Sequence, residues 1–342
     1  MSDPGITFFA TAGFPVLAIG ISYLAGAVRR RNAKRPVSML RHTAFAAGLA
    51  LLLLSLQWPF AVWAHELFYV HQIGILIARI VAPMLLAMAR PAGLIIAGIP
   101  RRLRARLVKP GLLARPTRRG WRVLSTPALV MICYVGSLYF WEIPDMQGDA
   151  LANPTIGLLM HFSLLGAGLL FWTRLFEKRP VPHGIVHAQR LMMIWLAILS
   201  QIALGAYITV KTTVLYHAYD ATQRAAVISP LSDEAFGGFF IWIASGLLSL
   251  IGLICVVDLW GRHETRQDAK RTRWSSSNSA ILLYPSTGQR LREMARPKNR
   301  RLAIGLTAFV LLVFTAVCGI VAGAHRINRR DNLRSYQLSR SA

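Results

Sequence analysis

Long apolar segments recur along this chain and constrain its fold more than any other feature. Windows of about 19 residues identify eight of them. They lie near residues 6–28, 42–63, 72–98, 124–141, 155–173, 190–210, 236–260 and 302–324. A helix of about 20 residues crosses a hydrocarbon core of roughly 30 Å and satisfies its backbone hydrogen bonds internally. The sequence therefore predicts an all-α, polytopic transmembrane helix bundle of about eight spans.

The composition excludes an ordinary soluble domain and argues against nucleic-acid binding. Of the 342 residues, 54% are hydrophobic and only 15% are charged, whereas soluble domains carry about 25% charged residues. The formal net charge is +25, but the basic residues lie between apolar segments instead of forming one contiguous face. We therefore expect membrane lipids, and no nucleic acid, around this chain.

The distribution of basic residues predicts the orientation. The loops at 29–41, 99–123, 174–190 and 261–301 hold 30 Lys and Arg residues, against 2 in the loops at 64–71, 142–154 and 211–235. Because basic loops remain cytoplasmic, we expect a multi-pass protein of the bacterial plasma (inner) membrane with its N-terminus outside. Eight spans would place the tail 325–342 outside despite its five arginines, so the side of that tail stays open.

The third apolar segment is the most unusual, because ionisable side chains stand at its mouth and inside it. Residues 65–91 read HELFYVHQIGILIARIVAPMLLAMARP, with His71 at the outer end and Arg79 about two turns further. An intramembrane charge is costly unless it faces protein or water, which makes Arg79 a candidate functional residue. Pro83 removes a backbone hydrogen bond and predicts a kink. We expect the other helices to surround this one.

Arg79 needs a counter-charge or a wet cavity inside the bundle. Glu142, at the outer end of the fourth segment, is the preferred partner, and Glu66 is the second choice. One interpretation is a structural ion pair or a snorkelling side chain. The other is a binding or transport function, in which Arg79 and the kinked third helix hold an anion, a quinone or a partner helix.

Histidine and methionine residues on the predicted outer side suggest a copper site. His71 and His161 are the main candidates, because both lie in the outer half of the membrane. Weaker candidates are His65, His217, Met160 and Met146. Imidazole and thioether ligands suit copper, and thioethers favour Cu(I). No fixed spacing defines the site, however: His161 could be hydrogen-bonded between helices, and His65 and His217 could be solvated.

No motif typical of an enzyme occurs in a suitable structural context. The sequence lacks a nucleophile elbow, a phosphate-binding loop, a dinucleotide fingerprint and a zinc-protease motif. We therefore expect a protein without catalytic residues.

Several stretches together resemble the CtaG-type cytochrome c oxidase assembly factors. They are His71 with the apolar run to Val81, Ala82 and Pro83, then Trp141 to Pro144, Pro154 to Trp172 with His161, Leu215 to Tyr219, Ser232 to Gly238, and Ile241 with Trp242. The resemblance covers roughly residues 40–260. It implies a seven-span membrane bundle over 1–260. The basic cytoplasmic loop at 261–301, the extra transmembrane helix at 302–324 and the basic tail at 325–342 lie outside the resemblance and follow from hydropathy and charge alone.

The chain departs from the family pattern at several expected ligand positions. Ile75 stands where the family has a second histidine, and Glu142 replaces another. Gly157 and Met160 occupy positions where a histidine and a glutamate are expected. The resemblance thus implies a scaffold role in oxidase maturation more directly than it implies metal handling.

Three functions follow as hypotheses. The first is assembly or maturation of a haem–copper terminal oxidase, in which the protein contacts the oxidase subunits and helps copper insertion on the outer side of the membrane. The second is the binding or transport function built on Arg79. The third is a stable accessory subunit of a respiratory complex. The oligomeric state stays open.

Overall fold

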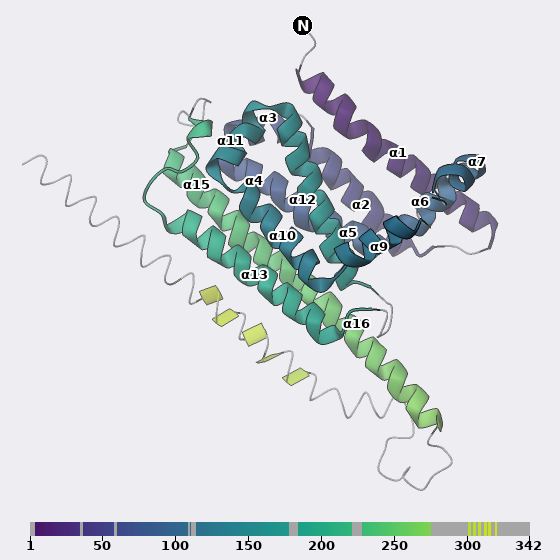
Figure 1. The fold of residues 1–342 in the computed structure, drawn as a ribbon. Coiled ribbons are helices and arrows are strands. Elements are labelled where there is room, and N and C mark those ends of the chain that lie inside the picture. Colours follow the sequence, from purple (N-terminus) through teal and green to yellow (C-terminus); the bar gives the residue numbers. More distant parts are fainter. Residues whose placement is uncertain are drawn as a thin grey trace, which may run out of the picture. The chain divides into compact units, whose positions relative to one another are not determined.

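The computed structural model describes residues 4–34, 37–57, 60–108, 110, 114–177, 184–220 and 228–274, together with scattered residues between 300 and 319. Throughout this described part the chain is helical and contains no strand (Figure 1). The expected all-α class is therefore confirmed.

The helices of the first half are α1 Pro4–Asn32, α2 Met39–Ser55, α3 Phe60–Glu66, α4 Phe68–Leu76, the π-helix η1 Ile77–Val81, α5 Ala82–Ala89, α6 Ala92–Gly98, α7 Arg101–Leu103, the π-helix η2 Arg104–Val108, α9 Arg115–Leu124 and α10 Pro127–Trp141. Those of the second half are α11 Pro144–Ala152, α12 Pro154–Leu175, α13 His187–Val210, the 3-10 helix η3 His217–Tyr219, α15 Pro230–Phe239, the π-helix η4 Phe240–Ala244 and α16 Ser245–Trp274.

The chain divides into two compact units, Met1–Leu253 and Ile254–Ala342. The first unit holds every contact on which the site depends. In the second unit, Arg262 Nε lies 2.8 Å from Asp258 Oδ2 along the same helix, an exposed pair of the kind that favours helix formation slightly.

Four helices are long and apolar enough to cross a membrane. They are Phe68–Ala89, Pro154–Leu175, His187–Val210 and Pro230–Arg262. A fifth span results if α9 and α10, which meet at an angle of 69°, are taken together. These elements correspond to the expected third to seventh segments.

The other three predicted spans, at 6–28, 42–63 and 302–324, differ in how far the structure supports them. Helix α1 covers the first segment, near 6–28. Helix α2 has only 17 residues and ends at Ser55, so the segment expected at 42–63 is interrupted before the separate short helix α3. Most of the segment at 302–324 lies outside the described residues. The count of about eight spans therefore stays a prediction.

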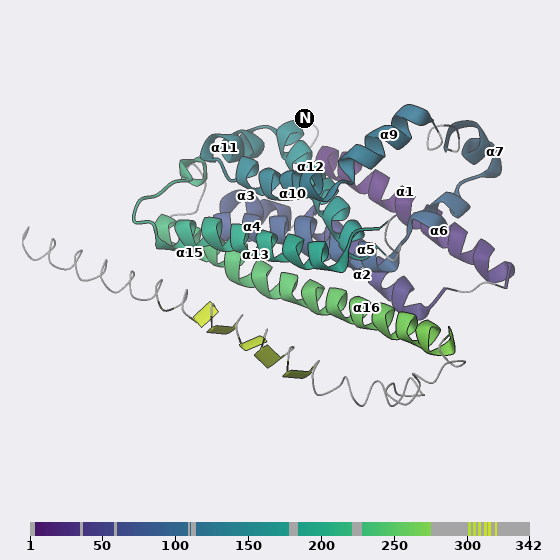
Figure 2. The same cartoon turned by 60° about the horizontal axis from the view of Figure 1, so that its bottom comes forward.

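The segment α4–η1–α5 is the most enclosed of the long helices. Buried residues make up 67% of its most apolar window, against 39–44% in the other three spans. It packs against α2, α12, α15 and η4 (Figure 2). Helices from both halves of the chain therefore pack around this segment, in line with its predicted central position.

Prolines begin several of these helices. Pro127, Pro144, Pro154 and Pro230 occupy the first turns of α10, α11, α12 and α15. At this position proline loses no helical hydrogen bond, and its fixed φ suits the helix. Asn153 adds a cap to α12, because its side-chain oxygen accepts from Thr155 N at 2.9 Å.

Arginines close the C-terminal ends of two helices, α5 and α12. Arg41 donates to Ala89 O at 2.8 Å and to Arg90 O at 3.1 Å. Arg90, in the left-handed region with φ 51°, donates to Phe176 O at 2.9 Å. Arg190 donates to Leu175 O at 3.2 Å. The last carbonyls of a helix have no partner within that helix, so these arginines act as C-terminal caps.

Candidate functional site

The centre of the bundle contains a break in helical pitch just before Pro83. Residues Ile77–Val81 form a π-helix, and α5 begins at Ala82 with Pro83 in its first turn. A single π-turn inside an α-helix often marks a functional site. The hydrogen-bonding pattern of the helix therefore changes directly before Pro83, in a π-helix that contains Arg79.

A glycine on the neighbouring helix accommodates this π-helix. Gly168 of α12 lies so close to the Arg79 carbonyl that a Cβ there would collide with it and would stand 2.9 Å from Pro83 Cγ. Two turns earlier on α12 is His161. The close approach at Gly168 thus sets the distance between the helix that carries His71 and the helix that carries His161.

His71 and His161 are neighbours in the structure. Their ring centroids lie 6.2 Å apart, with the rings tilted by 39°. His71 is 6% exposed, and its buried Nε2 has no hydrogen-bond partner among the residues that the structure describes. His161 is half-buried, and its Nδ1 lies 2.8 Å from Gly157 O. An Nδ1–H donated to that carbonyl leaves the other ring nitrogen of His161 as an acceptor.

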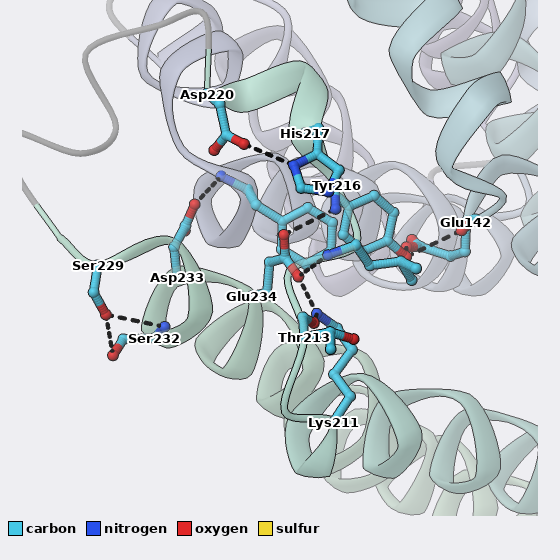
Figure 3. A network of polar contacts seen from close by, with 12 residues as sticks. Glu142, Lys211, Thr213, Tyr216, His217, Asp220, Ser229, Ser232, Asp233 and Glu234 are labelled. Atoms are coloured by element: carbon cyan, nitrogen blue, oxygen red, sulfur yellow. Dashed lines mark hydrogen bonds and ion pairs between the residues drawn. The ribbon is translucent and has the colours of Figure 1, made fainter. Parts of the chain in front are cut away.

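The weaker metal candidates fall into two groups. Met160 is buried in an apolar cluster, and Met146 packs against the same cluster. This cluster also contains Tyr219, whose ring centroid lies 6.3 Å from that of His71. His65 and His217 are exposed, and His217 Nδ1 lies 2.9 Å from Asp220 Oδ2 (Figure 3). In the described part of the chain, no group of three or more His, Cys, Asp or Glu residues is placed to hold a metal ion.

Glu142 is held by neutral partners at the end of α10. Its Oε2 accepts from Gln72 Nε2 at 3.1 Å and from Tyr216 Oη at 3.1 Å, while its buried Oε1 has no partner. Burial raises the pKa of Glu142 to about 7, against the lowering effect of these two hydrogen bonds and of the Arg79 charge. Gln72 directly follows His71 in α4, so Glu142 is hydrogen-bonded to a neighbour of the histidine pair.

Arg79 does not form the direct ion pair with Glu142 that we expected from the sequence. Its guanidinium carbon lies 3.8 Å from the centroid of the Tyr134 ring, and one terminal nitrogen donates to Tyr134 O at 2.9 Å. The ring of Tyr134 is in turn stacked on Phe171. A cation over an aromatic face is stabilised by the ring quadrupole, and the carbonyl adds a charge-assisted hydrogen bond. A backbone atom and a ring thus make the direct contacts with Arg79, while Glu142 interacts with its charge without touching it.

A small cavity adjoins Arg79. It measures about 10 Å³ and is lined by Gln72, Arg79 and Ser245 among apolar side chains. Arg79 Nε and Gln72 Oε1 are buried near it without partners. A cavity of this volume holds about one water molecule. It has no room for a quinone or an organic anion in this conformation.

Two adjacent carboxylates whose roles were missed from the sequence fasten the site. Asp233 accepts from the backbone N–H groups of Phe68 and Tyr69, both at 3.0 Å, and thereby caps the start of α4. Helix α4 has no cap from its own N-cap residue Leu67. The cap comes instead from α15, which is far away in the sequence (Figure 3).

Glu234 fastens the segment before η3 in the same way. It accepts from Leu215 N at 3.0 Å and Tyr216 N at 2.9 Å, and it forms an ion pair with Lys211. Both Asp233 and Glu234 are fully buried. Adjacent acidic residues that open an apolar helix are the signal that could have indicated this role.

Comparison with known proteins identifies the family. The family model described as cytochrome c oxidase caa3 assembly factor (Caa3_CtaG) matches residues 21–263. This chain belongs to that family. The match covers the whole resemblance found in the sequence, including the histidine pair, the π-helix and the Asp233 cap. The Caa3_CtaG core thus coincides with the helices that form the candidate site.

The curated relatives are uncharacterized proteins of mycobacteria. The chain is 24% identical over 306 residues to uncharacterized protein ML1998 of Mycobacterium leprae, which is 85% of this chain and 45% of that protein. It is 23% identical over 295 residues to proteins of Mycobacterium bovis and Mycobacterium tuberculosis, covering 83% of this chain and 43% of each relative. The chain therefore spans less than half the length of these relatives. No solved structure matches it.

Proposed function

We propose that this protein supports the assembly of a haem–copper terminal oxidase and that its His71–His161 pair receives cuprous copper as cargo. Membership in the Caa3_CtaG family supports the assembly role. The observation that supports copper is the buried, unpartnered Nε2 of His71 beside the ring of His161. A buried nitrogen without a partner is costly, and a metal ion would satisfy it.

The separation of the two rings suits a shared metal ion. Metal–imidazole bonds of about 2.0 Å to two nitrogens on opposite sides of an ion place the ring centroids about 6 Å apart. The observed separation is 6.2 Å. Two imidazoles satisfy the low coordination number that Cu(I) accepts, and the buried thioether of Met160, next to His161, is the soft ligand that favours this oxidation state. A two-coordinate site also suits cargo that must leave again.

The predicted orientation places this pair on the outer side of the plasma membrane. Lys and Arg are concentrated in the loops on the other side of the bundle. Copper would thus be received at the face where the loops 64–71, 142–154 and 211–235 meet. The partners in this proposal are oxidase subunits and the surrounding lipids, and the role is non-catalytic, in keeping with an assembly-factor family.

Deletion and complementation test the assembly role. We expect a deletion strain to lose oxidase activity and haem absorbance, and the wild-type gene to restore both. His71→Ala should fail to restore them, whereas His217→Ala should restore them because that side chain is exposed. Normal oxidase levels in the deletion strain would rule the assembly role out.

Copper binding is tested separately on the purified protein. Competition with a chromogenic Cu(I) chelator should give about one ion per chain, with affinity at least tenfold lower in His71→Ala and His161→Ala and unchanged in His217→Ala. If all three variants bind as the wild type does, the copper site is wrong while the assembly role stands.

The stable-subunit hypothesis has a direct discriminator. A subunit co-purifies with the assembled oxidase in fixed stoichiometry, whereas an assembly factor is recovered with precursors lacking copper.

The alternative binding or transport function built on Arg79 finds less support, since the cavity beside Arg79 holds about one water molecule. Arg79→Met, which keeps the side-chain volume, should leave copper binding intact.

A further inference from the structure

A second site lies where the end of α1 meets the segment that joins α6 to α7. A hollow of about 640 Å³ opens there, lined by Arg29, Arg30, Ala33, Ala97, Arg101 and Arg104. Four of its six lining residues are arginines and none is acidic. No role in oxidase assembly or copper handling has been given to these residues.

Two glycines bring the basic end of α1 close to α6, which leads into Arg101 of α7 and Arg104 of η2. A Cβ at Gly26 would collide with Leu94 O and stand 3.1 Å from Gly98 N, and a Cβ at Gly98 would collide with Ser22 O. Only residues without a side chain permit this approach. The helices therefore hold the arginines at one place by rigid backbone packing, and the hollow is built into the fold.

Backbone carbonyls orient part of the cluster. Arg29 donates to Ala97 O and, at 3.1 Å, to Ile99 O. Arg104 lies 3.4 Å from Ile96 O. Carbonyls position a guanidinium without neutralising it. None of the four arginines forms an ion pair with another described residue, so the hollow keeps a formal charge of about +4 that calls for an anionic ligand.

The surroundings favour a lipid over a dissolved anion. The same α1 carries Ile21, Leu24 and Val28 at 69%, 64% and 58% exposure. These residues recur at helical spacing on the face of α1 opposite to Arg29, Arg30 and Ala33. They make α1 a lipid-facing helix, and its basic end then lies at the depth of the headgroups. Membrane-facing apolar residues followed by a basic pocket are the arrangement that holds the headgroup of an anionic lipid.

We propose that this hollow binds the phosphate groups of an anionic membrane phospholipid. Guanidinium groups bind phosphate oxygens in pairs, and four arginines match two phosphates better than one. The volume also exceeds what one phosphate occupies, because it falls in the range of small-molecule pockets. A two-phosphate lipid such as cardiolipin is therefore the preferred ligand, and a one-phosphate lipid binds more weakly.

Neighbouring arginines provide a matched control for the test. Arg30→Ala/Arg101→Ala removes two lining charges and spares Arg29, which also caps α6. Arg31→Ala/Arg102→Ala removes the next residue in each segment; these two are exposed and do not line the hollow. Both double variants lower the net charge equally. The full-length protein, purified in detergent, is titrated with cardiolipin and with phosphatidylglycerol and followed by native mass spectrometry.

We expect the lining variant to bind cardiolipin about 25-fold more weakly, since each basic residue near an anionic headgroup contributes a factor of about 5. The control variant should change by less than about threefold. Equal losses in both variants would overturn the proposal in favour of diffuse attraction. Displacement of the lipid by millimolar inorganic phosphate, at constant ionic strength, would overturn it in favour of a free-phosphate site.

A third variant guards against misfolding. Arg30→Lys/Arg101→Lys keeps the charge but loses the paired donors, so cardiolipin should bind with intermediate affinity. Unchanged binding in this folded variant together with unchanged binding in the alanine variant would also contradict the site. None of these variants should alter copper binding at His71 and His161, which separates this proposal from the function above.

Discussion

At the scale of single residues, Glu142 connects the chemistry of the site with its stability. It is 4% exposed, and only neutral side chains donate hydrogen bonds to it. Its pKa is raised to about 7. Between the ordinary value near 4.5 and about 7, the folded protein keeps a proton that the unfolded chain releases. The stability should therefore fall as the pH rises through this window and level off above it.

Glu142→Gln removes this pH dependence. Over the range from pH 4.5 to 7.5, we expect the melting temperature of the wild type to fall by several degrees more than that of the variant, corresponding to roughly 3 kcal/mol at most. Tryptophan fluorescence during heating in detergent measures both. Asp149→Asn is the control, because Asp149 is exposed, and its profile should follow the wild type. A wild-type profile that is flat or rises across this range would contradict the expectation.

At the scale of helices, the contact between α12 and η1 can be tested with two glycines of one helix. A Cβ at Gly168 would collide with the Arg79 carbonyl, whereas a Cβ at Gly166 meets nothing within 4 Å. Gly168→Ala should destabilise the protein by about 1–3 kcal/mol through overpacking. Gly166→Ala should be neutral or slightly stabilising, because alanine favours a helix more than glycine does.

Thermal unfolding and Cu(I) competition provide the measurements for this pair. Gly168→Ala should also weaken copper binding, since it moves the helix of His161 away from that of His71. If both alanines lower the melting temperature equally, the close approach at Gly168 is not what sets the spacing of these helices.

The cap that Asp233 supplies to the start of α4 is a second contact between helices that can be tested. Asp233→Ala leaves the N–H groups of Phe68 and Tyr69 buried without an acceptor, at a cost of about 1–2 kcal/mol. Hydrogen exchange followed by mass spectrometry should show faster exchange in peptides that contain the start of α4. Asp145→Ala, an exposed residue in the first turn of α11, should leave those peptides unchanged. Unaltered exchange in the Asp233 variant would show that another group caps α4.

The sequence predicted elements better than it predicted partners. The apolar segments place the third to seventh spans because hydropathy is a local property. The direct contacts of Arg79 were missed because carboxylates can be counted in a sequence, whereas a backbone carbonyl and a ring such as those of Tyr134 become available only through packing. Asp233 was missed for the same reason, since its contact with α4 joins residues 165 positions apart and no local spacing encodes it.

At the scale of the whole molecule, the orientation in the membrane decides on which side His71 receives its ligand. Asp145 and Arg119 are both exposed and lie in loops predicted to face opposite sides. In a background whose native cysteines are replaced by serine, Asp145→Cys should react with a membrane-impermeant maleimide in intact cells. Arg119→Cys should react only after permeabilisation. The reverse pattern would place the histidine pair on the cytoplasmic side and would exclude copper delivery from outside.

The arginines that finish the helices have a consequence for how this protein can vary. Arg41 and Arg190 each use two nitrogens to reach two carbonyls, and Arg190 joins Ile185 O to Leu175 O. A lysine at these positions would still serve as a topogenic signal during insertion, but it would reach both carbonyls from one nitrogen, without the spaced donors of the planar guanidinium. Insertion therefore requires only the positive charge of this side chain, whereas holding the helix ends together favours the fixed donor geometry of arginine over lysine.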